Sequence, residues 1–484
     1  MNDLLISRRD LLKSGAALAA GMSGLFSLGG CETLLQDIQN RPVRRNISLL
    51  ANNDPVVEAY RAAVSAMIAL PSSDLRNWTN QSQIHANFCP HGNWFFLPWH
   101  RAYLVYFERI CRKLSGYADF ALPYWDWTCA RAIPQHFWGS GNPLTHARSV
   151  TATDQLTDDM VGETVMDSIF ALTDFQLFGS GSATELRPPT TNYGQLEGGP
   201  HNGVHGWVGG DMGYIARSPL DPIFWCHHNM LEACWVNWNI NMSNPNPNDP
   251  TWYNLSLGNN MFCDENGVPV GTLSVAVTSL MPYFDYQFDN QLMPCSSIGT
   301  GGMKKVKQWE SAALKKFLSE GGPSGITAVQ TVSAERPVTM RLNGSATHTL
   351  EWPGAVLNLL QGTSATQRVL VKAKSVESDQ AEDSFVRVFV NLPGADANTS
   401  IHDPHFAGSF AFFGGNHMHD GHGTVQANFY VDITDTLKRL AGDGGMVAGR
   451  NVSLHFVLVP MHKGTNAASH VTIGAVDLSL SRLH

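Results

Sequence analysis

The chain has 484 residues, which is too many for a single hydrophobic core, with 43% hydrophobic and 15% charged residues. This composition is typical of a folded soluble protein and excludes an intrinsically disordered chain. The net charge of −9 leaves no excess of basic residues, so nucleic acid is not an expected partner.

Residues 1–31 have the composition of an export signal. The pair Arg8-Arg9 stands in a twin-arginine pattern, and small, weakly apolar residues follow it to Leu28. Twin-arginine signals direct bacterial export, so we expect a periplasmic or extracellular protein. Leu28-Gly29-Gly30-Cys31 resembles a lipobox, which would place a lipid anchor on Cys31. An ordinary cleavage site with an incidental cysteine fits the same residues.

Residues 32–320 are expected to form a mainly helical domain. Apolar residues at helical spacing predict helices at 56–70, 99–114 and 223–240, and an amphipathic charged helix at 304–320. The pair Asp221-Pro222 is a helix-opening signal.

The period of the pattern changes beyond this region. A Gly-rich stretch opens a predicted linker at 321–335. Short β-rich runs between turn residues follow at 368–374, 385–390, 429–433, 452–458 and 471–480. Residues 336–484 therefore predict a β-sandwich. The predicted fold class is α+β, with a mainly helical domain followed by an all-β sandwich domain.

The candidate metal-binding histidines lie in two dense groups among Trp and Phe residues. The first holds His85, His91 and His100, and the second, about 100 residues later, holds His201, His205, His227 and His228. Because His201 and His205 are four residues apart, they share one helical face. A buried imidazole needs a partner for its ring nitrogens, and a metal ion supplies one.

The ligand types narrow the choice of metal. A di-iron bundle needs inward Glu residues and Glu-x-x-His pairs, which are absent here. A zinc protease motif needs Glu after the first His of His-x-x-x-His, where this chain has Asn202. All-imidazole sites suit copper or zinc. Three imidazoles per ion suit O2 binding between two coppers, and zinc-dependent hydrolysis stays open on the residues alone.

Both groups resemble the copper signatures of the tyrosinase family of type-3 copper proteins. The first matches at His91, Phe96, Trp99-His100-Arg101, Leu104 and Glu108, and the second at Asp221-Pro222-x-Phe224 and His228. The resemblance implies two copper ions, the first bound by His85, His91 and His100 and the second by His201, His205 and His228. His227 stands beside a ligand, but in the family pattern the second His of the pair coordinates.

The resemblance also implies roles for neighbouring residues. Cys89-Pro90-His91 resembles the Cys-x-His of fungal members and molluscan haemocyanins, so we expect a thioether crosslink between Cys89 and His91; a buried free thiol is the alternative. Glu197 and Asn202 match the pair that holds a water thought to take the proton of a monophenol, a general-base role. A solvated loop carboxylate and a polar helix residue are the alternatives for these two.

Two positions bear on details of the site. Ile215 stands thirteen residues before His228, where some plant members carry a bulky Phe over the copper. An Ile predicts a less covered site, and core packing explains it equally well. Glu232 replaces the usual Asp four residues after His228, and we expect it to support neighbouring groups by hydrogen bonds.

The resemblance continues past the predicted linker. Residues 383–391 and 406–410 resemble the C-terminal β-domain of plant polyphenol oxidases, which can cover the copper site and keep the enzyme latent. The segment 412–422 is rich in Gly, His and Met, and it either shields the site, passes copper to it or forms a solvated hairpin.

The implied activity is the O2-dependent ortho-hydroxylation of monophenols, the oxidation of o-diphenols to o-quinones, or both. Two alternatives stay open. The first is a catechol or o-aminophenol oxidase without monophenolase activity, and the second is a haemocyanin-like O2-binding protein. The expected partners are O2 and a small phenol.

Overall fold

The computed structural model describes residues 41–257, 260–289, 326–354, 360, 367–379, 384–413, 426–442, 450–462, 465 and 469–483. The export signal, the lipobox, the helix predicted at 304–320 and residues 414–422 of the Gly/His/Met-rich segment lie outside these residues. Among the helices of the described residues, none combines the length and apolar character needed to cross a membrane.

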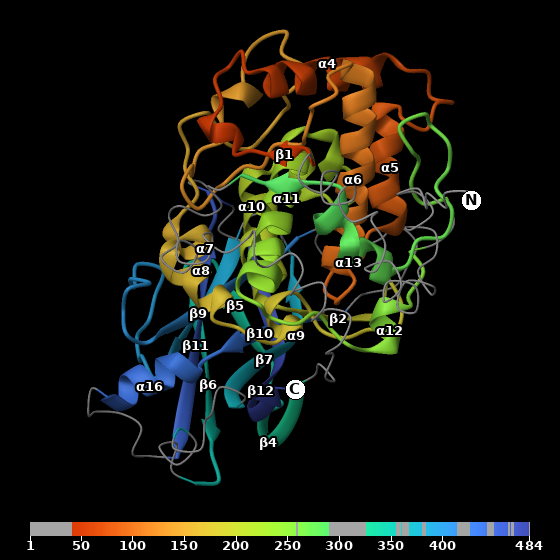
Figure 1. Cartoon of the computed structure of the whole chain (residues 1–484). Helices are drawn as coiled ribbons and strands as arrows, with labels where there is room; N and C mark the ends of the chain where they lie inside the picture. Colours follow the sequence, from red (N-terminus) through yellow and green to blue (C-terminus); the bar gives the residue numbers. More distant parts are fainter. Residues whose placement is uncertain are drawn as a thin grey trace.

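The first part of the chain is helical and is built around one long central helix, α6 (Figure 1). Helices α4, α11 and α13 all pack against α6. The helices are α4 Pro55–Ala69, α5 Trp78–Phe88, α6 Phe96–Ser115, α7 Asp158–Val161, α8 Glu163–Phe170, α9 Phe175–Phe178, α10 Asn202–Val208, α11 Ile223–Val236, α12 Pro250–Tyr253 and α13 Val275–Phe284, with short strands β1 Val43–Arg44, β2 Thr190–Tyr193 and β3 Gln287–Phe288.

The predicted helices are present with shifted ends. Helix α6 begins three residues before the predicted Trp99, because Pro98 is tolerated within the first helical turn. It ends at Ser115 and is followed by Gly116, whose φ of 72° places it in the left-handed region that glycine adopts without strain. Helix α11 ends at Val236, and residues 237–240, predicted to belong to the same α-helix, instead lie in a π-helical turn that ends at Asn241.

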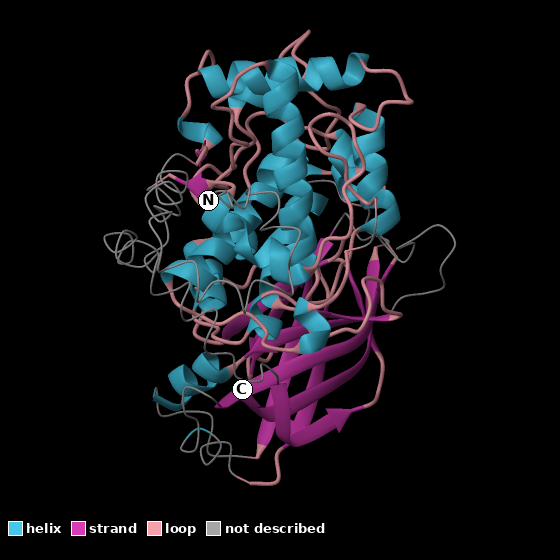
Figure 2. Ribbon diagram, turned by 45° about the vertical axis from the view of Figure 1, so that its right-hand side comes forward, coloured by secondary structure: helices cyan, strands magenta, loops and turns pink. Residues whose placement is uncertain are grey.

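The second part consists of two β-sheets that share one core (Figure 2). In the described residues, a six-stranded sheet has the order β2-β10-β7-β12-β4 with β5 also pairing β12, and a four-stranded sheet has the order β6-β11-β8-β9. The elements are β4 Ile326–Ala334, β5 Val338–Arg341, β6 Ser345–Glu351, β7 Gln367–Ser378, β8 Ser384–Val390, β9 Phe406–Ala411, β10 Gln426–Asp432, α16 Thr434–Gly442, β11 Asn451–Pro460 and β12 His470–Leu483. The predicted fold class, helical then β, is confirmed.

Two features differ from the sequence-based expectation. Residues 326–334, predicted to belong to the linker, form β4, which pairs antiparallel with β12. The Gly-rich composition ends at Gly325, and the β-branched residues frequent beyond it favour a strand. Strand β2, from the helical part, pairs in parallel with β10 and so joins the C-terminal sheet. The two parts therefore share a sheet.

Candidate metal centre

The first group of histidines is held by two helices and the turn between them. His85 lies on the last turn of α5, and His100 lies on the first turns of α6. His91 stands in the connecting turn, directly before Gly92, whose φ is +64°. A side chain at position 92 would collide with Thr191, so the tight turn that presents His91 requires glycine.

The second group lies on three consecutive helical segments. His201 ends η3 (Glu197–His201), a π-helical turn that contains Pro200. Because proline has no N–H to donate to an α-helical ladder, the wider turn is favoured there. His205 lies one turn further on α10, and His228 lies in the middle of α11.

All six rings converge in the interior, and none is more than 4% exposed. The rings of His100 and His228 stack with centroids 4.5 Å apart, and those of His91 and His201 lie 5.6 Å apart. The Nε2 atoms of His205 and His228 are 3.1 Å apart. The structure thus brings together the six histidines that the sequence selected, although they come from segments more than 100 residues apart.

Hydrogen bonds behind the rings fix how four of them face the centre. The Nδ1 atoms of His85, His100 and His205 lie 2.7–2.8 Å from the backbone oxygens of Ile215, Phe96 and Met212. His201 Nδ1 lies 2.8 Å from Asn202 Oδ1. Since an oxygen of this kind only accepts, each Nδ1 must carry the proton. The lone pair of each ring is therefore on Nε2.

These nitrogens fit a metal ion. The Nε2 atoms of His91, His100 and His201 are buried without a hydrogen-bond partner, an arrangement that is costly in a folded protein unless a bound group fills it. Burial lowers the pKa of the His201 ring to about 3 and holds the pKa values of His91, His100, His205 and His228 well below the usual range. The rings are thus neutral, as coordination requires.

Comparison with known proteins agrees with this donor set. Residues 70–194 and 148–241 match the common central domain of tyrosinase, and residues 339–480 match the C-terminal domain of chloroplastic polyphenol oxidase. The chain belongs to the tyrosinase and polyphenol oxidase family. Members of this family are type-3 copper oxidases, and the buried imidazoles are accordingly a copper site.

Relatives resemble the chain over most of its length. Tyrosinase HcTyr1 of Hahella sp. (strain CCB-MM4) is 27% identical over 432 residues, covering 80% of this chain and 85% of that protein. The latent polyphenol oxidase of Prunus armeniaca is 24% identical over 488 residues, covering 91% and 76%. A structure of latent aurone synthase shares the fold with a TM-score of 0.67 at 22% identity, covering 92% of this chain and 90% of that one.

His227 also lies in the cluster, since its ligand atom is within 4.8 Å of those of His201, His205 and His228. The indole N–H of Trp127 donates to His227 Nδ1 at 3.1 Å. Because an indole N–H can only donate, Nδ1 is the accepting nitrogen and the neutral ring carries its proton on Nε2. This tautomer leaves His227 without a free lone pair for a metal, while the choice of His228 as the ligand stays a prediction.

His91 differs from the other rings in what lies behind it. Its Nδ1 is 3.5 Å from the sulfur of Cys89, which is a free, buried thiol. Burial raises the pKa of this thiol to about 12, so the thiol is neutral. The two side chains predicted to be crosslinked are therefore in contact, while the crosslink itself stays a prediction.

Glu197 is fully buried beside the turn that carries His91. It accepts a hydrogen bond from Gly92 N at 2.8 Å and another from the Ser180 hydroxyl. Burial raises the pKa of its carboxyl to about 8. The solvated-loop alternative for Glu197 is thus wrong. Asn202 accepts from His201 and donates from Nδ2 to the backbone oxygen of Ala411 at 2.9 Å.

A buried ion pair supports both groups of ligands from behind. Arg101 Nε donates to the two carboxylate oxygens of Glu232 at 2.9 and 3.0 Å, and Tyr286 also donates to Glu232. Arg101 follows His100 on α6, and Glu232 lies one turn after His228 on α11. Glu232 therefore serves as the predicted supporting carboxylate, with Arg101 as its partner.

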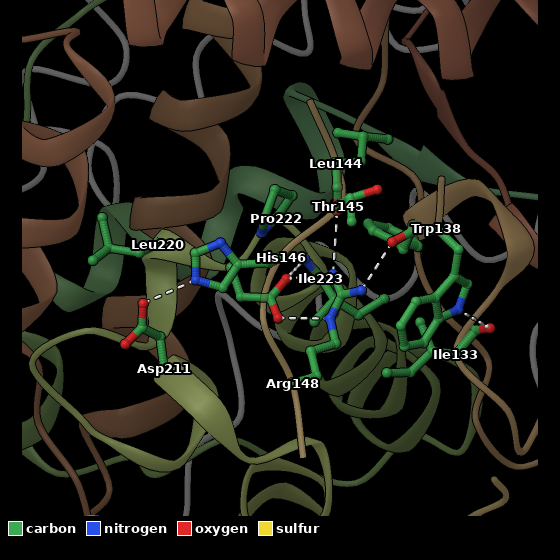
Figure 3. Close-up of polar contacts among 12 residues, drawn as sticks. Ile133, Trp138, Leu144, Thr145, His146, Arg148, Asp211, Leu220, Pro222 and Ile223 are labelled. Atoms are coloured by element: carbon green, nitrogen blue, oxygen red, sulfur yellow. Dashed lines mark hydrogen bonds and ion pairs between the residues drawn. The ribbon is translucent and has the colours of Figure 1, made fainter. Parts of the chain in front are cut away.

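A further support, which the sequence did not reveal, lies outside the copper site (Figure 3). The side chain of Arg148 is fully buried and donates to both oxygens of Asp221 at 2.8 and 2.7 Å. Asp221 in turn accepts from Ile223 N at the start of α11. Nearby, His146 pairs with Asp211 at 2.9 Å, one residue before the Met212 carbonyl that orients His205. Only the helix-opening Asp221-Pro222 pair was visible in the sequence.

The C-terminal part closes the site. The ring of Phe413 stacks on His205 with centroids 3.9 Å apart, and it lies 5.4 Å from both His91 and His201. Phe413 is 5% exposed. Of the segment 412–422, the described residues Phe412 and Phe413 are buried, and Phe413 lies over the imidazoles. Ile215 itself is buried, which fits the core-packing alternative, and the cover comes from Phe413 instead.

Proposed function

We propose that the chain binds two copper ions, one through His85, His91 and His100 and one through His201, His205 and His228, and oxidises phenols with O2. The observation that carries this proposal is the convergence of six buried imidazoles. The Nε2 atoms of His91, His100 and His201 have no hydrogen-bond partner, and those of His205 and His228 lie 3.1 Å apart. Bound copper would supply O2 activation and electron transfer. The chain's own residues orient the metal ligands, exclude water and handle the phenol proton.

Glu197 is the group best suited to take that proton. A carboxyl whose pKa is about 8 in the metal-free chain is a far stronger base than an exposed glutamate. Positive charge from bound copper would lower this pKa and keep the group ionised near neutral pH. Asn202 would share in holding the water between Glu197 and the phenol. We therefore propose both ortho-hydroxylation of monophenols and oxidation of o-diphenols.

Copper stoichiometry tests the ligand assignment. We expect two copper ions per chain in the wild type, about one in His228→Ala, and two in the matched variant His227→Asn, whose neighbour Trp127 argues against coordination. A wild type without copper overturns the proposal. Equal copper loss in the two variants overturns the choice between the adjacent histidines.

Substrate tests separate the activities. Oxygen uptake with tyrosine, catechol and o-aminophenol distinguishes a tyrosinase from an oxidase that lacks monophenol hydroxylation. In Glu197→Gln, we expect hydroxylation of tyrosine to fall about 100-fold or more, since general-base catalysis contributes 10²–10⁴-fold, while catechol oxidation changes little. An unchanged rate of tyrosine hydroxylation in Glu197→Gln would contradict the proposed role of Glu197.

The position of Phe413 supports a latent enzyme. Its ring occupies the space above His205 that a phenol would need, so the β-part must move before substrate enters. The same cover also suits an O2 carrier, and the octopus haemocyanin functional unit shares this fold with a TM-score of 0.52. Reversible O2 uptake without product formation in Phe413→Ala would favour the carrier; turnover of catechol favours the oxidase.

We propose export by the twin-arginine pathway, with Cys31 as a candidate lipid anchor. The support is the sequence pattern at Arg8-Arg9 and at residues 28–31. In a bacterial host, Arg8→Lys combined with Arg9→Lys should leave the protein in the cytoplasm, and Cys31→Ala should release it from membranes. Wild-type protein that is found free of membranes would contradict the lipid anchor. Export of the double variant would contradict the twin-arginine pathway.

A further inference from the structure

A cavity of about 320 Å³ lies at the seam between the helical part and the β-part, away from the imidazoles. Helix α8 and Gln195 line it from the helical side. Strand β7, the loop 401–407 and α16 line it from the other side. Figure 1 shows α8 and α16 on the same flank of the molecule. The volume is within the range of small-molecule sites.

Two of the residues that line the cavity carry donors that the protein itself does not fill. Nε of Arg368 is buried and has no hydrogen-bond partner, and the same is true of Nε2 of Gln195. These two groups come from opposite sides of the seam. A buried donor without a partner is destabilising, and more so when it is charged, so an acceptor that reaches both groups would be bound favourably.

The nearby carboxylates balance the charge of Arg368 without filling its hydrogen bonds. Asp432 and Asp435 lie 3.7 and 3.9 Å from its nitrogens, beyond hydrogen-bond distance. Burial raises the pKa of Asp432 from its ordinary value. Leu172, Ile401 and Phe406 supply apolar surface beside the donors.

We propose that this cavity binds a small organic carboxylate, with its oxygens on Arg368 and Gln195 and its carbon skeleton against Leu172, Ile401 and Phe406. The planar guanidinium matches a carboxylate, and an amide N–H on the other side completes the pair. Such a ligand contacts both parts of the molecule at once. It therefore binds only the docked arrangement and favours that arrangement over the open one.

The site is also connected to the copper centre. Gln195 lies two residues before Glu197, at the start of the helical segment that carries Glu197 and His201. If Phe413 keeps the enzyme latent while the two parts are docked, the carboxylate inhibits the enzyme without contacting copper. This inhibition rests on the proposed function.

Calorimetric titration of the full chain with hexanoate tests the site, and the copper-loaded and copper-free forms are titrated separately. We expect hexanoate to bind both forms, and hexanamide, its neutral counterpart, to bind at least tenfold more weakly. Arg368→Gln and Gln195→Leu should each weaken hexanoate binding, the former about tenfold or more. Arg336→Gln, which removes an exposed arginine of the same part, should leave it unchanged.

Absence of hexanoate binding in the wild type, equal binding of hexanamide, or full affinity in both site variants overturns the proposed site. Because binding is measured without turnover, these outcomes do not depend on the oxidase assignment. Slower catechol oxidation by the intact chain in hexanoate, relieved in Arg368→Gln, supports the coupling to docking. Binding with no change in rate in either protein overturns that coupling.

Discussion

Glu197→Gln should change how the stability of the copper-free chain depends on pH. Burial raises the pKa of this carboxyl from 4.5 to about 8, so the folded state prefers the neutral form. The free energy of unfolding is therefore highest below pH 4.5 and falls as the pH rises through 8. At about 1.36 kcal/mol per pKa unit, the total loss is about 5 kcal/mol.

The variant should escape this loss. A glutamine keeps the acceptor for Gly92 N, and the Ser180 hydroxyl can turn to accept from the new amide, so both contacts survive. Guanidinium unfolding followed by Trp fluorescence should give similar stabilities at pH 5 and a more stable variant at pH 8.5. Glu58→Gln, on the exposed side of α4, serves as the control. An identical pH dependence in wild type and Glu197→Gln would refute the assignment of Glu197 as a buried, neutral group.

Three further variants address separate parts of the site. Arg148→Lys loses the two-point contact with Asp221 at the start of α11, so we expect copper affinity in chelator competition to fall about 10-fold or more while the fold is kept; unchanged affinity contradicts this supporting role. Phe413→Ala should raise catechol oxidation by the intact chain and lower its stability by about 3 kcal/mol, and an unchanged rate would contradict the shielding role. The peptide spanning Cys89 and His91 should be two hydrogens lighter in copper-loaded wild type than its sequence requires; the full mass there, or the same loss in Cys89→Ser, would exclude the crosslink.

The histidines were predictable because their positions are encoded locally. His201 and His205 are four residues apart, and His91, Phe96 and His100 follow a spacing that a turn and a helix start can satisfy. Their family resemblance then supplied the long-range pairing of the two groups. A physical reason to choose His228 over His227 as a ligand needed the structure, because it depends on the Trp127 indole, which lies 100 residues away in the sequence.

The sequence predicted Glu232 as a support and a C-terminal part that covers the site, but the partners that meet across long stretches of chain were not predictable. Arg148 meets Asp221 across 73 residues, Arg387 meets Asp159 across 228, and β2 pairs with a strand more than 230 residues later. The periodicity of a sequence does not predict which residues pair over such distances. Each of these residues, taken alone, is an ordinary polar or β-branched residue. The β4 error has a local cause instead, since Gly and Pro mark where a linker begins more clearly than where it ends.

The contacts of Asn202 suggest that the two proposed activities differ in how strongly docking suppresses them. In the docked arrangement the Asn202 amide donates one N–H to Ala411 and its oxygen accepts from His201, so only the second N–H is left to hold a water beside Glu197. Phe413→Ala removes the ring over His205 but leaves the contact between Asn202 and Ala411, because the accepting oxygen of Ala411 belongs to the main chain of β9. Catechol oxidation, which needs space but not that water, should therefore recover more than tyrosine hydroxylation. Equal recovery of both rates, measured as oxygen uptake by the intact variant, would mean that Asn202 does not hold the catalytic water.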